Sequence, residues 1–324
     1  MLINPFALLS FALRAAFDSA SSSCEKSLPV GGQAVIEGVI MKGPSHWGMA
    51  VRKPEGDIFR DRWSCAGWDK KGIWSRPVLR GVATMAEMMR EGFRALSRSA
   101  QIALGEEEEL TTKDLVISVL VSIVAVVGLF VALPLWIGDL FGRWFDLGHL
   151  GRHAVEGLAR GLVFVAYVGC IGLWKDIREV LMYHGAEHKT INAFEGGSPM
   201  TVKRIRSYSR IHPRCGTSFL MVVVVVSIVV FSLAGGGGVL WRIGSRVVLL
   251  PLVVGLSYEI IRASSKWGSL GRSIMAPALS LQYLTTRVPS GAQIEVALRA
   301  LESALNVKFT PDTPGRSVYG ESRL

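Results

Sequence analysis

The sequence has little charge and no clustered cysteines. Only 19% of its 324 residues are charged, against about 25% in soluble globular domains. Its four cysteines are widely separated and contain no CxxC pair, which excludes a disulfide framework. Its 35 glycines show no period, which excludes a collagen-like chain. Half of the residues are hydrophobic and the mean hydropathy is +0.36, a composition typical of a membrane protein.

Four apolar segments are candidates for membrane spans. A helix needs roughly 20 apolar residues to cross a hydrocarbon core about 30 Å thick. Residues 115–137 and 218–240 reach this length without a charged side chain. Residues 154–174 contain Glu156 and Arg160, which a span tolerates if both side chains extend to the interface. The fourth and shortest candidate covers residues 247–261. We therefore predict four spans.

Lysine and arginine predict how these spans are oriented. They are concentrated before the first span, in the loop 175–217 and after the fourth span, while the two remaining loops hold only Arg143, Arg152, Arg242 and Arg246. The positive-inside rule then predicts that both termini and the loop 175–217 are cytosolic. This orientation also explains the net charge of +10. We predict no nucleic-acid partner, because the sequence lacks the basic and aromatic surface typical of RNA binders.

The segment before the first span divides into two parts. Residues 28–75 are predicted to form a small cytosolic β-rich unit, because two strand-like runs flank a turn-forming Pro-Glu-Gly sequence. Residues 76–114 are predicted to form an amphipathic helix. Three arginines lie along one face of this helix: Arg90, Arg94 and Arg98. They indicate either a solvated stripe or an interfacial helix near anionic lipid, and the sequence leaves both interpretations open.

The remaining segments complete the predicted fold class. Residues 115–262 form the four-span membrane region, and residues 263–305 form a cytosolic amphipathic tail that ends in a helix. Residues 1–27 make a poor signal peptide and are predicted to be a disordered or interfacial extension. Residues 306–324 are predicted to be disordered. We therefore predict an integral membrane protein, mainly α, with about four transmembrane helices, a small cytosolic β-rich N-terminal unit and a C-terminal amphipathic helix.

The loop 175–217 contains the densest cluster of polar residues. His184 and His188 are four residues apart, so a helix presents both imidazoles on one face. Glu187 completes an HxxEH pattern, which is typical of the inverted zinc metallohydrolases. In those enzymes the two histidines bind zinc and the glutamate is the general base. The alternative interpretation is a helix end with two solvated histidines.

A second segment of the same loop supports a metal site. His212 and Cys215 are three residues apart and resemble half of a zinc site. Together with His184 and His188 they predict a divalent-metal site, with zinc as the favoured ion. Glu195 is an additional candidate that ranks lower, because it joins only if the helix breaks before it. Three protein ligands make a catalytic site and four make a structural one. Glu187 slightly favours the catalytic interpretation, and the alternative is that this carboxylate orients an imidazole.

Two further acidic positions have both a functional and a structural interpretation. Gln33 and Glu37 are four residues apart, so either a strand or a helix places them on one face. The buried carboxylate needs a partner, which is a basic side chain or the metal. Glu259, in the fourth span, is either a functional intramembrane acid or the partner of Arg262.

Long motifs resemble one family, the YqhQ family of bacterial multi-pass membrane proteins, which are catalogued as predicted metal-dependent enzymes. The resemblance rests on GGQAVIEGVIMKGP, RPVLRG, YHGAEHKTINAFE, HPRCGTSF and LSLQYLTTRVP. It implies that the histidines, Glu187 and Cys215 form one site with Gln33 and Glu37 close by, in a bacterial cytoplasmic membrane. Ala278 and Val288 depart from the family's tail pattern, which has Gly and an acid there.

These features predict a metal-dependent hydrolase at the cytosolic membrane face. Its partners would be membrane lipids, and its substrate a lipid-linked molecule or a membrane protein. The alternative is a non-enzymatic scaffold or assembly factor in which the same ligands form a closed structural zinc site. A transporter that uses Glu259 is disfavoured, because the sequence has no paired, Gly/Pro-broken spans.

Overall fold

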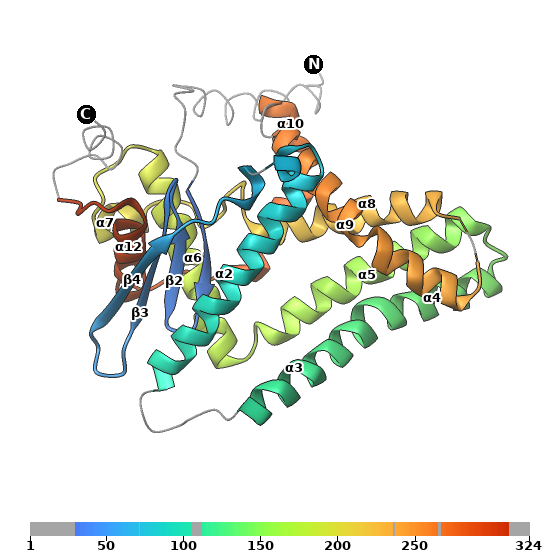
Figure 1. Cartoon of the computed structure of the whole chain (residues 1–324), viewed down its shortest axis with the longest axis horizontal. Coiled ribbons are helices and arrows are strands. Elements are labelled where there is room, and N and C mark those ends of the chain that lie inside the picture. Colours follow the sequence, from blue (N-terminus) through green and yellow to red (C-terminus); the bar gives the residue numbers. More distant parts are fainter. Residues whose placement is uncertain (1–29, 71, 105–111, 236, 265–266, 311–324) are drawn as a thin grey trace, which may run out of the picture.

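The computed structural model describes residues 30–70, 72–104, 112–235, 237–264 and 267–310. The predicted extension 1–27, most of the predicted disordered end and residues 105–111 lie outside these ranges. The described part is mainly helical and has one small antiparallel sheet near its N-terminus, as the sequence predicts. Figure 1 shows the sheet at one end of the molecule and long helices at the other.

The sheet is a four-stranded meander. Its strands pair in chain order, and their bounds are β1 Gly31–Val35, β2 Gly38–Lys42, β3 His46–Arg52 and β4 Ile58–Ser64. A tight turn joins β1 to β2, and Glu37 adopts a left-handed φ of 50° there. The predicted Pro-Glu-Gly turn joins β3 to β4, where Gly56 has a φ of 100°.

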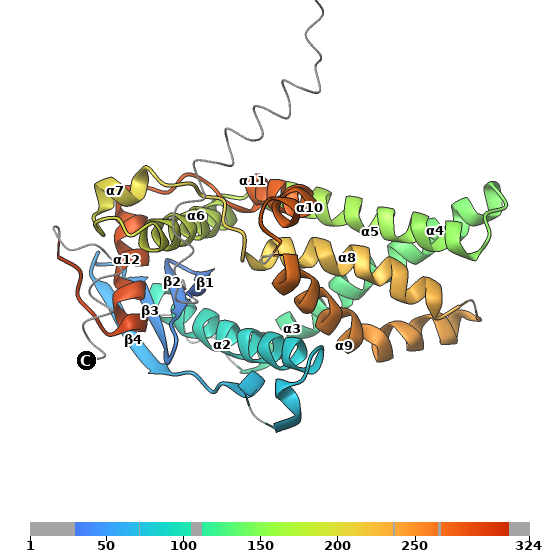
Figure 2. The same cartoon turned by 90° about the horizontal axis from the view of Figure 1, so that it is seen from above.

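Helices cover both faces of this sheet. On one face lie α6 (Lys175–Glu195) and α12 (Gly291–Leu305), and on the other lies α2 (Leu79–Leu104). Figure 2 shows the sheet between them. Alternate side chains of β2 enter the two cores: Met41 packs with α12 and Ile40 packs on the α2 side. The sheet and the C-terminal helix thus share one core, a contact that the sequence does not predict.

A glycine allows α12 to lie close to the sheet. A Cβ atom at Gly48 would be 2.2 Å from the backbone nitrogen of Ala304, a distance that backbone atoms cannot tolerate. Ala300 and Ala304 present small side chains at the same contact, and both are fully or almost fully buried. The core continues into residues 306–310, where Phe309 packs against Phe194.

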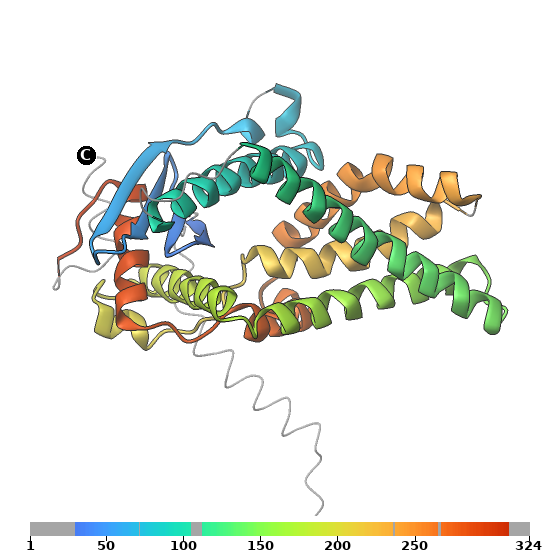
Figure 3. The ribbon, with the colours of Figure 1, turned by 90° about the horizontal axis from the view of Figure 1, so that it is seen from below.

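Four helices are long and apolar enough to cross a membrane: Val116–Trp144, Gly151–Ile171, Gly216–Leu233 and Ile243–Ser264. They belong to α3 (Thr112–Val127) with α4 (Leu133–Trp144), α5 (His149–Ile171), α8 (Gly216–Leu233) and α9 (Val239–Ser264). The first is longer than predicted, because a π-helical turn, Gly128–Ala132, joins α3 to α4. It runs along the outside of the bundle, as Figure 3 shows in green.

The two helical hairpins point the same way. The loops between α4 and α5 and between α8 and α9 lie at the end of the molecule opposite the sheet (Figure 1). This places the two loops that are poor in lysine and arginine together, on the opposite side from the basic segments. The remaining short helices are η1 Trp68–Lys70, η2 Gly72–Ser75, α7 Val202–Arg206, α10 Gly268–Ser280 and α11 Gln282–Thr285.

A buried charge cluster joins these helices inside the bundle. Glu156 of α5 accepts hydrogen bonds from Arg160 at 2.8 Å and from Arg246 of α9 at 3.1 and 2.5 Å. Arg160 also donates to the carbonyl of Phe130 in the π-helical turn at 3.0 Å and to Ser227 of α8 at 3.2 Å. The sequence predicts that Glu156 and Arg160 extend to the interface, and this is wrong. Glu156 is buried, Arg160 is partly buried, and the two pair with each other within the bundle.

Helix α2 is attached to the fourth candidate span at its first turn. Glu259 accepts hydrogen bonds from the Arg80 guanidinium at 2.7 Å and from the backbone nitrogen of Val78 at 3.2 Å. Val78 has a left-handed φ of 69°, and its side chain lies against Gly255. Glu259 thus forms an ion pair with Arg80 of the RPVLRG motif.

The arginine stripe of α2 contacts aromatic rings. The guanidinium carbons of Arg90, Arg94 and Arg98 lie 5.5, 4.8 and 5.4 Å from the ring centroids of Trp68, Trp63 and Phe59. These side chains remain about half exposed. The arginines therefore cover the aromatic side chains of β4 and η1 through cation–π contacts.

Candidate metal centre

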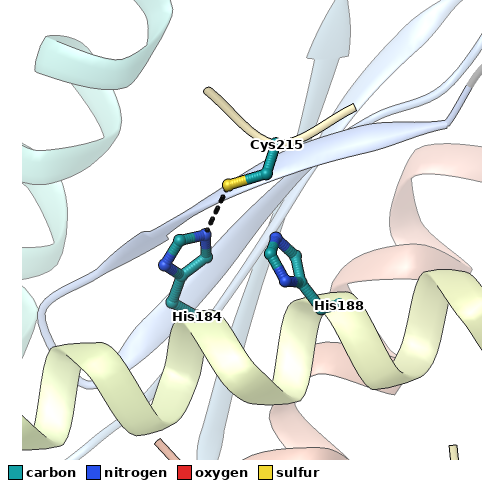
Figure 4. Close-up of side chains that lie close together, drawn as sticks. All are labelled: His184, His188 and Cys215. Atoms are coloured by element: carbon teal, nitrogen blue, oxygen red, sulfur yellow. Dashed lines mark hydrogen bonds between the residues drawn. The ribbon is translucent and has the colours of Figure 1, made fainter. Parts of the chain in front are cut away.

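Two segments bring three possible metal ligands together. His184 and His188 lie one turn apart on α6, and Cys215 is the N-cap residue of α8. Figure 4 shows both imidazoles pointing toward the Cys215 thiol. The Cys215 Sγ is 3.3 Å from His184 Nε2, and one ligand atom from each residue lies within 4.8 Å of the others. The predicted ligands His184, His188 and Cys215 thus lie close together, and we call these three residues the ligand group.

Backbone carbonyls orient both imidazoles. His184 Nδ1 lies 2.7 Å from the carbonyl oxygen of Thr285, and His188 Nδ1 lies 2.6 Å from that of Arg210. A carbonyl only accepts hydrogen bonds, so each Nδ1 carries the proton and donates it. In both histidines the lone pair is therefore on Nε2, and Nε2 is the atom that would bind a metal. Metal-binding histidines in proteins commonly donate their other ring nitrogen to a carbonyl in this way.

Two buried polar atoms beside this group have no hydrogen-bond partner among the described residues. They are His188 Nε2 and Glu187 Oε2. A buried polar atom without a partner costs about 1–3 kcal/mol, and a metal ion would satisfy the His188 nitrogen. Two imidazole nitrogens and one thiolate are a donor set that suits zinc. The residues therefore fit a zinc ion.

Glu187 is held against the sheet. Only 4% of it is exposed, and a Cβ atom at Gly32 of β1 would be 3.1 Å from its Oε1. Burial raises the pKa of Glu187 to about 7, and the charge of His184 acts in the opposite direction. The glycine at position 32 leaves the space that this carboxyl group occupies.

His212 lies beside the ligand group and contacts other residues. Its ring centroid is 5.7 Å from that of His188. Its Nε2 is 3.4 Å from Glu195 Oε2, and its Nδ1 accepts a hydrogen bond from the backbone nitrogen of Arg214 at 3.4 Å. Burial lowers the pKa of His212, although the hydrogen bond to Glu195 raises it. Both ring nitrogens of His212 are therefore occupied.

Glu195 belongs to the same neighbouring cluster. Helix α6 continues without a break to Glu195, which pairs with Arg214 and His212. Burial raises the pKa of Glu195, but the hydrogen bond to His212 and the charge of Arg214 outweigh it and lower the pKa overall. The structure thus places Glu195 with His212, at the edge of the ligand group.

Gln33 and Glu37 lie on different sides of the sheet's first hairpin. Gln33 faces α2, where its amide lies 3.4 Å from the Met88 carbonyl. Glu37 accepts a hydrogen bond from the Tyr183 hydroxyl at 3.1 Å. Burial raises the pKa of Glu37, and the neighbouring Glu179 raises it further. The shared face that the spacing predicts is absent, because Glu37 sits in the turn and not in the strand.

Sequence reasoning missed Gln282, which fixes the second ligand segment. Its side chain is completely buried. The Oε1 atom accepts from the His212 backbone nitrogen at 2.8 Å, and Nε2 donates to the His212 carbonyl and to Ser218 Oγ, both at 2.8 Å. The LSLQYLTT motif was the available signal. Gln282 holds the backbone from which Cys215 extends.

We expect Gln282→Ala to weaken zinc binding by about 10–100-fold, the usual effect of removing a group that orients a metal ligand. The substitution leaves the backbone nitrogen and carbonyl of His212 buried without their partner. Chelator competition on the purified protein measures the affinity. The matched control is Gln101→Ala, an exposed position on α2. Equal affinities for the two variants would show that Gln282 does not position the site.

The fold and the site define the class of this protein. It combines four membrane-type helices with a small sheet module, and a His/His/Cys group lies where the two meet. A family model described as "Protein of unknown function (DUF1385)" matches residues 76–307, so the chain belongs to this family. That stretch contains all three residues of the ligand group. The sheet precedes it.

A curated relative agrees with this assignment. The chain is 30% identical over 295 residues to the uncharacterized protein YqhQ of Bacillus subtilis (strain 168), covering 86% of this chain and 92% of that protein. The predicted resemblance to the YqhQ family is thereby confirmed. A search of solved structures finds no match.

Proposed function

We propose that this protein is a metal-dependent hydrolase of the cytosolic membrane face. The observation that supports the proposal best is the orientation of the two histidines. Carbonyls of Thr285 and Arg210 hold both Nδ1 atoms, so both Nε2 atoms are available beside the Cys215 thiol. Without a bound ion this arrangement is unfavourable, because His188 Nε2 is buried and has no hydrogen-bond partner among the described residues.

Each residue of the site has a role in this proposal. His184, His188 and Cys215 would hold a divalent ion, and the donor set favours zinc. The bound ion supplies Lewis acidity to the reaction. Glu187 takes the proton of the attacking water and returns it to the leaving group. His212 is engaged with Glu195 and Arg214, so it would not serve as a fourth ligand, and three protein ligands are typical of catalytic sites.

The location of the site favours a substrate held in the membrane. Cys215 caps α8, so the ligand group lies at the start of a candidate span. The basic segments lie on the same side as the sheet, and the positive-inside rule assigns that side to the cytosol. We therefore propose membrane lipids as partners, and a lipid-linked molecule or a membrane protein as substrate.

Glu187→Gln tests the catalytic role. We expect the variant to keep about one zinc per chain and to lose hydrolytic activity by about 10²–10⁴-fold, the usual contribution of a general base. Elemental analysis measures the metal, and a panel of ester, phosphate and peptide substrates in detergent measures hydrolysis. Glu179→Gln, on the same helix, is the matched control. A wild-type protein that binds neither zinc nor manganese when supplied would overturn the proposal.

His212→Ala separates an enzyme from a structural zinc scaffold. We expect the variant to keep its metal, because both His212 ring nitrogens are already engaged outside the ligand group. A closed four-ligand site would instead lose the metal as completely as a His188 variant does. Metal content after dialysis against a weak chelator distinguishes the two outcomes.

A further inference from the structure

Two arginines without a carboxylate partner flank one tyrosine near the metal centre. The guanidinium carbon of Arg210 lies 5.4 Å from the Tyr283 ring centroid, and Arg287 Nη1 donates to the Tyr283 carbonyl at 3.2 Å. Within the described residues, neither arginine forms an ion pair with Asp or Glu. We call Arg210, Tyr283 and Arg287 the arginine patch.

The patch differs from three other arginines near the candidate spans, which pair with carboxylates. Arg80 pairs with Glu259, Arg214 pairs with Glu195, and Arg246 pairs with Glu156. The segment 196–217 contains no Asp or Glu, although it holds five basic residues: Lys203, Arg204, Arg206, Arg210 and Arg214. In the part of the chain that the structure describes, no carboxylate therefore pairs with Arg210 or Arg287, and an anion would complement their positive charge.

The patch lies at the end of a candidate span. Arg287 Nη2 would be 3.6 Å from a Cβ atom at Gly172, directly after the end of α5. Figure 2 shows α11, which carries Tyr283, beside this end of α5. Nearby aromatic and apolar side chains are exposed: Leu173 by 81%, Trp174 by 71% and Tyr283 by 57%. Exposed tryptophan and tyrosine at the end of a span are typical of the lipid headgroup level.

The patch is built on the backbone that orients the ligand group. The carbonyl of Arg210 holds His188, and the carbonyl of Thr285, two residues before Arg287, holds His184. The backbone nitrogen of Arg287 donates to the Leu181 carbonyl of α6 at 2.8 Å. A molecule bound at the patch is thus anchored on the same segments as the metal ligands.

We propose that the arginine patch binds the phosphate of an anionic lipid headgroup and so presents a phosphate-bearing lipid to the metal centre. Guanidinium groups bind phosphate oxygens through paired, charge-assisted hydrogen bonds. The exposed apolar side chains beside the patch suit the acyl chains of a lipid rather than a soluble phosphate. The proposed lipid site does not depend on the hydrolase. That the bound lipid is the substrate does rest on the proposed hydrolase.

Lipid titration of the full-length protein tests the patch. The protein in a neutral detergent is titrated with phosphatidylglycerol or phosphatidylcholine, and native mass spectrometry counts the bound lipid. We expect a preference for phosphatidylglycerol that falls at least about tenfold in Arg210→Gln/Arg287→Gln, because two charge-assisted contacts are lost. The control, Lys203→Gln/Arg204→Gln, removes the same charge from exposed positions on α7 and keeps the preference.

Three results would overturn the proposal. They are an equal loss in the control variant, equal binding of the two lipids by the wild type, and displacement of the lipid by inorganic phosphate at comparable concentration, which assigns the patch to a soluble phosphate. If the double variant does not fold, the single variants Arg210→Lys and Arg287→Lys replace it. They keep the charge but lose the paired geometry, so weaker binding is expected.

Metal content measured on the same samples separates this proposal from the hydrolase. A double variant that keeps its zinc and loses the lipid places the defect in the patch. A wild-type protein that binds phosphatidylglycerol selectively but no metal would overturn the hydrolase and leave the headgroup site supported.

Discussion

Replacing His188 with alanine is expected to reduce the affinity of the protein for zinc by about 100-fold. Zinc sites with four ligands bind with roughly 10–16 kcal/mol, so one ligand contributes about 3 kcal/mol or more, which corresponds to about 100-fold in affinity. His188 is 1% exposed, and its Nε2 has no other partner among the described residues. Competition with a chromogenic chelator measures the dissociation constant directly.

Two comparisons make this result specific. His46→Ala removes a histidine of β3 that lies outside the ligand group and is expected to leave the affinity unchanged. Cys215→Ser is expected to weaken zinc binding as His188→Ala does, because a hydroxyl is a poorer ligand for zinc than a thiolate. Wild-type affinity in the His188 variant would show that the imidazoles do not bind the ion.

Replacing Glu156 with glutamine is expected to lower the free energy of unfolding by about 3–5 kcal/mol, the usual cost of removing one partner from a buried ion pair. Glu156 is 3% exposed and accepts hydrogen bonds from both Arg160 and Arg246. The substitution takes the shared carboxylate from two guanidinium groups inside the helical bundle. Reversible unfolding of the detergent-solubilised protein in a denaturing detergent measures the change.

A double substitution and a surface control complete the test. Glu156→Gln with Arg246→Met removes both charges of one pair, and we expect it to recover part of the lost stability. Glu55→Gln, at the exposed turn between β3 and β4, is expected to change stability by less than about 0.5 kcal/mol. If Glu156→Gln is as stable as Glu55→Gln, the cluster does not stabilise the bundle.

Together these variants separate three parts of the molecule. His188 tests the ligand group on α6, Glu156 tests the contacts between the candidate spans, and Gln282 tests the connection between α11 and the Cys215 segment. Glu156 contacts other residues in the helical bundle, so its effect on stability is expected to be independent of the site. His188 and Gln282 both act on the ligand group, so their effects on zinc affinity are expected to be coupled.

The ligand group was predictable because its main determinant is local. His184 and His188 share a face on any helix, since four residues make about one turn. The sequence also placed Cys215 with them, on the basis of its position beside a span. It did not predict that His212, three residues away, would point at Glu195 and Arg214. The loop between α7 and α8 sets that direction, and local periodicity carries no information about it.

The orientation of His184 and of the His212 backbone depends on contacts between segments that are distant in the sequence. Gln282 and Thr285 lie far along the chain from α6, yet they hold the backbone of His212 and the ring of His184. Glu259 pairs with Arg80 across a longer separation of 179 residues. Such pairs follow from how the helices pack, so no spacing in the sequence indicates them.

The sequence by itself determined the membrane-type composition, the four long apolar helices, the small sheet and the HxxEH face. These follow from properties of short segments: the length that a bilayer requires, the period of a helix and the alternation of a strand. The tertiary structure alone decided that α12 completes the core of the N-terminal sheet, that Glu156 is buried and pairs with Arg160, and which nitrogen of each histidine faces Cys215. Those outcomes depend on which surfaces pack together, and that is fixed only when the whole chain is folded.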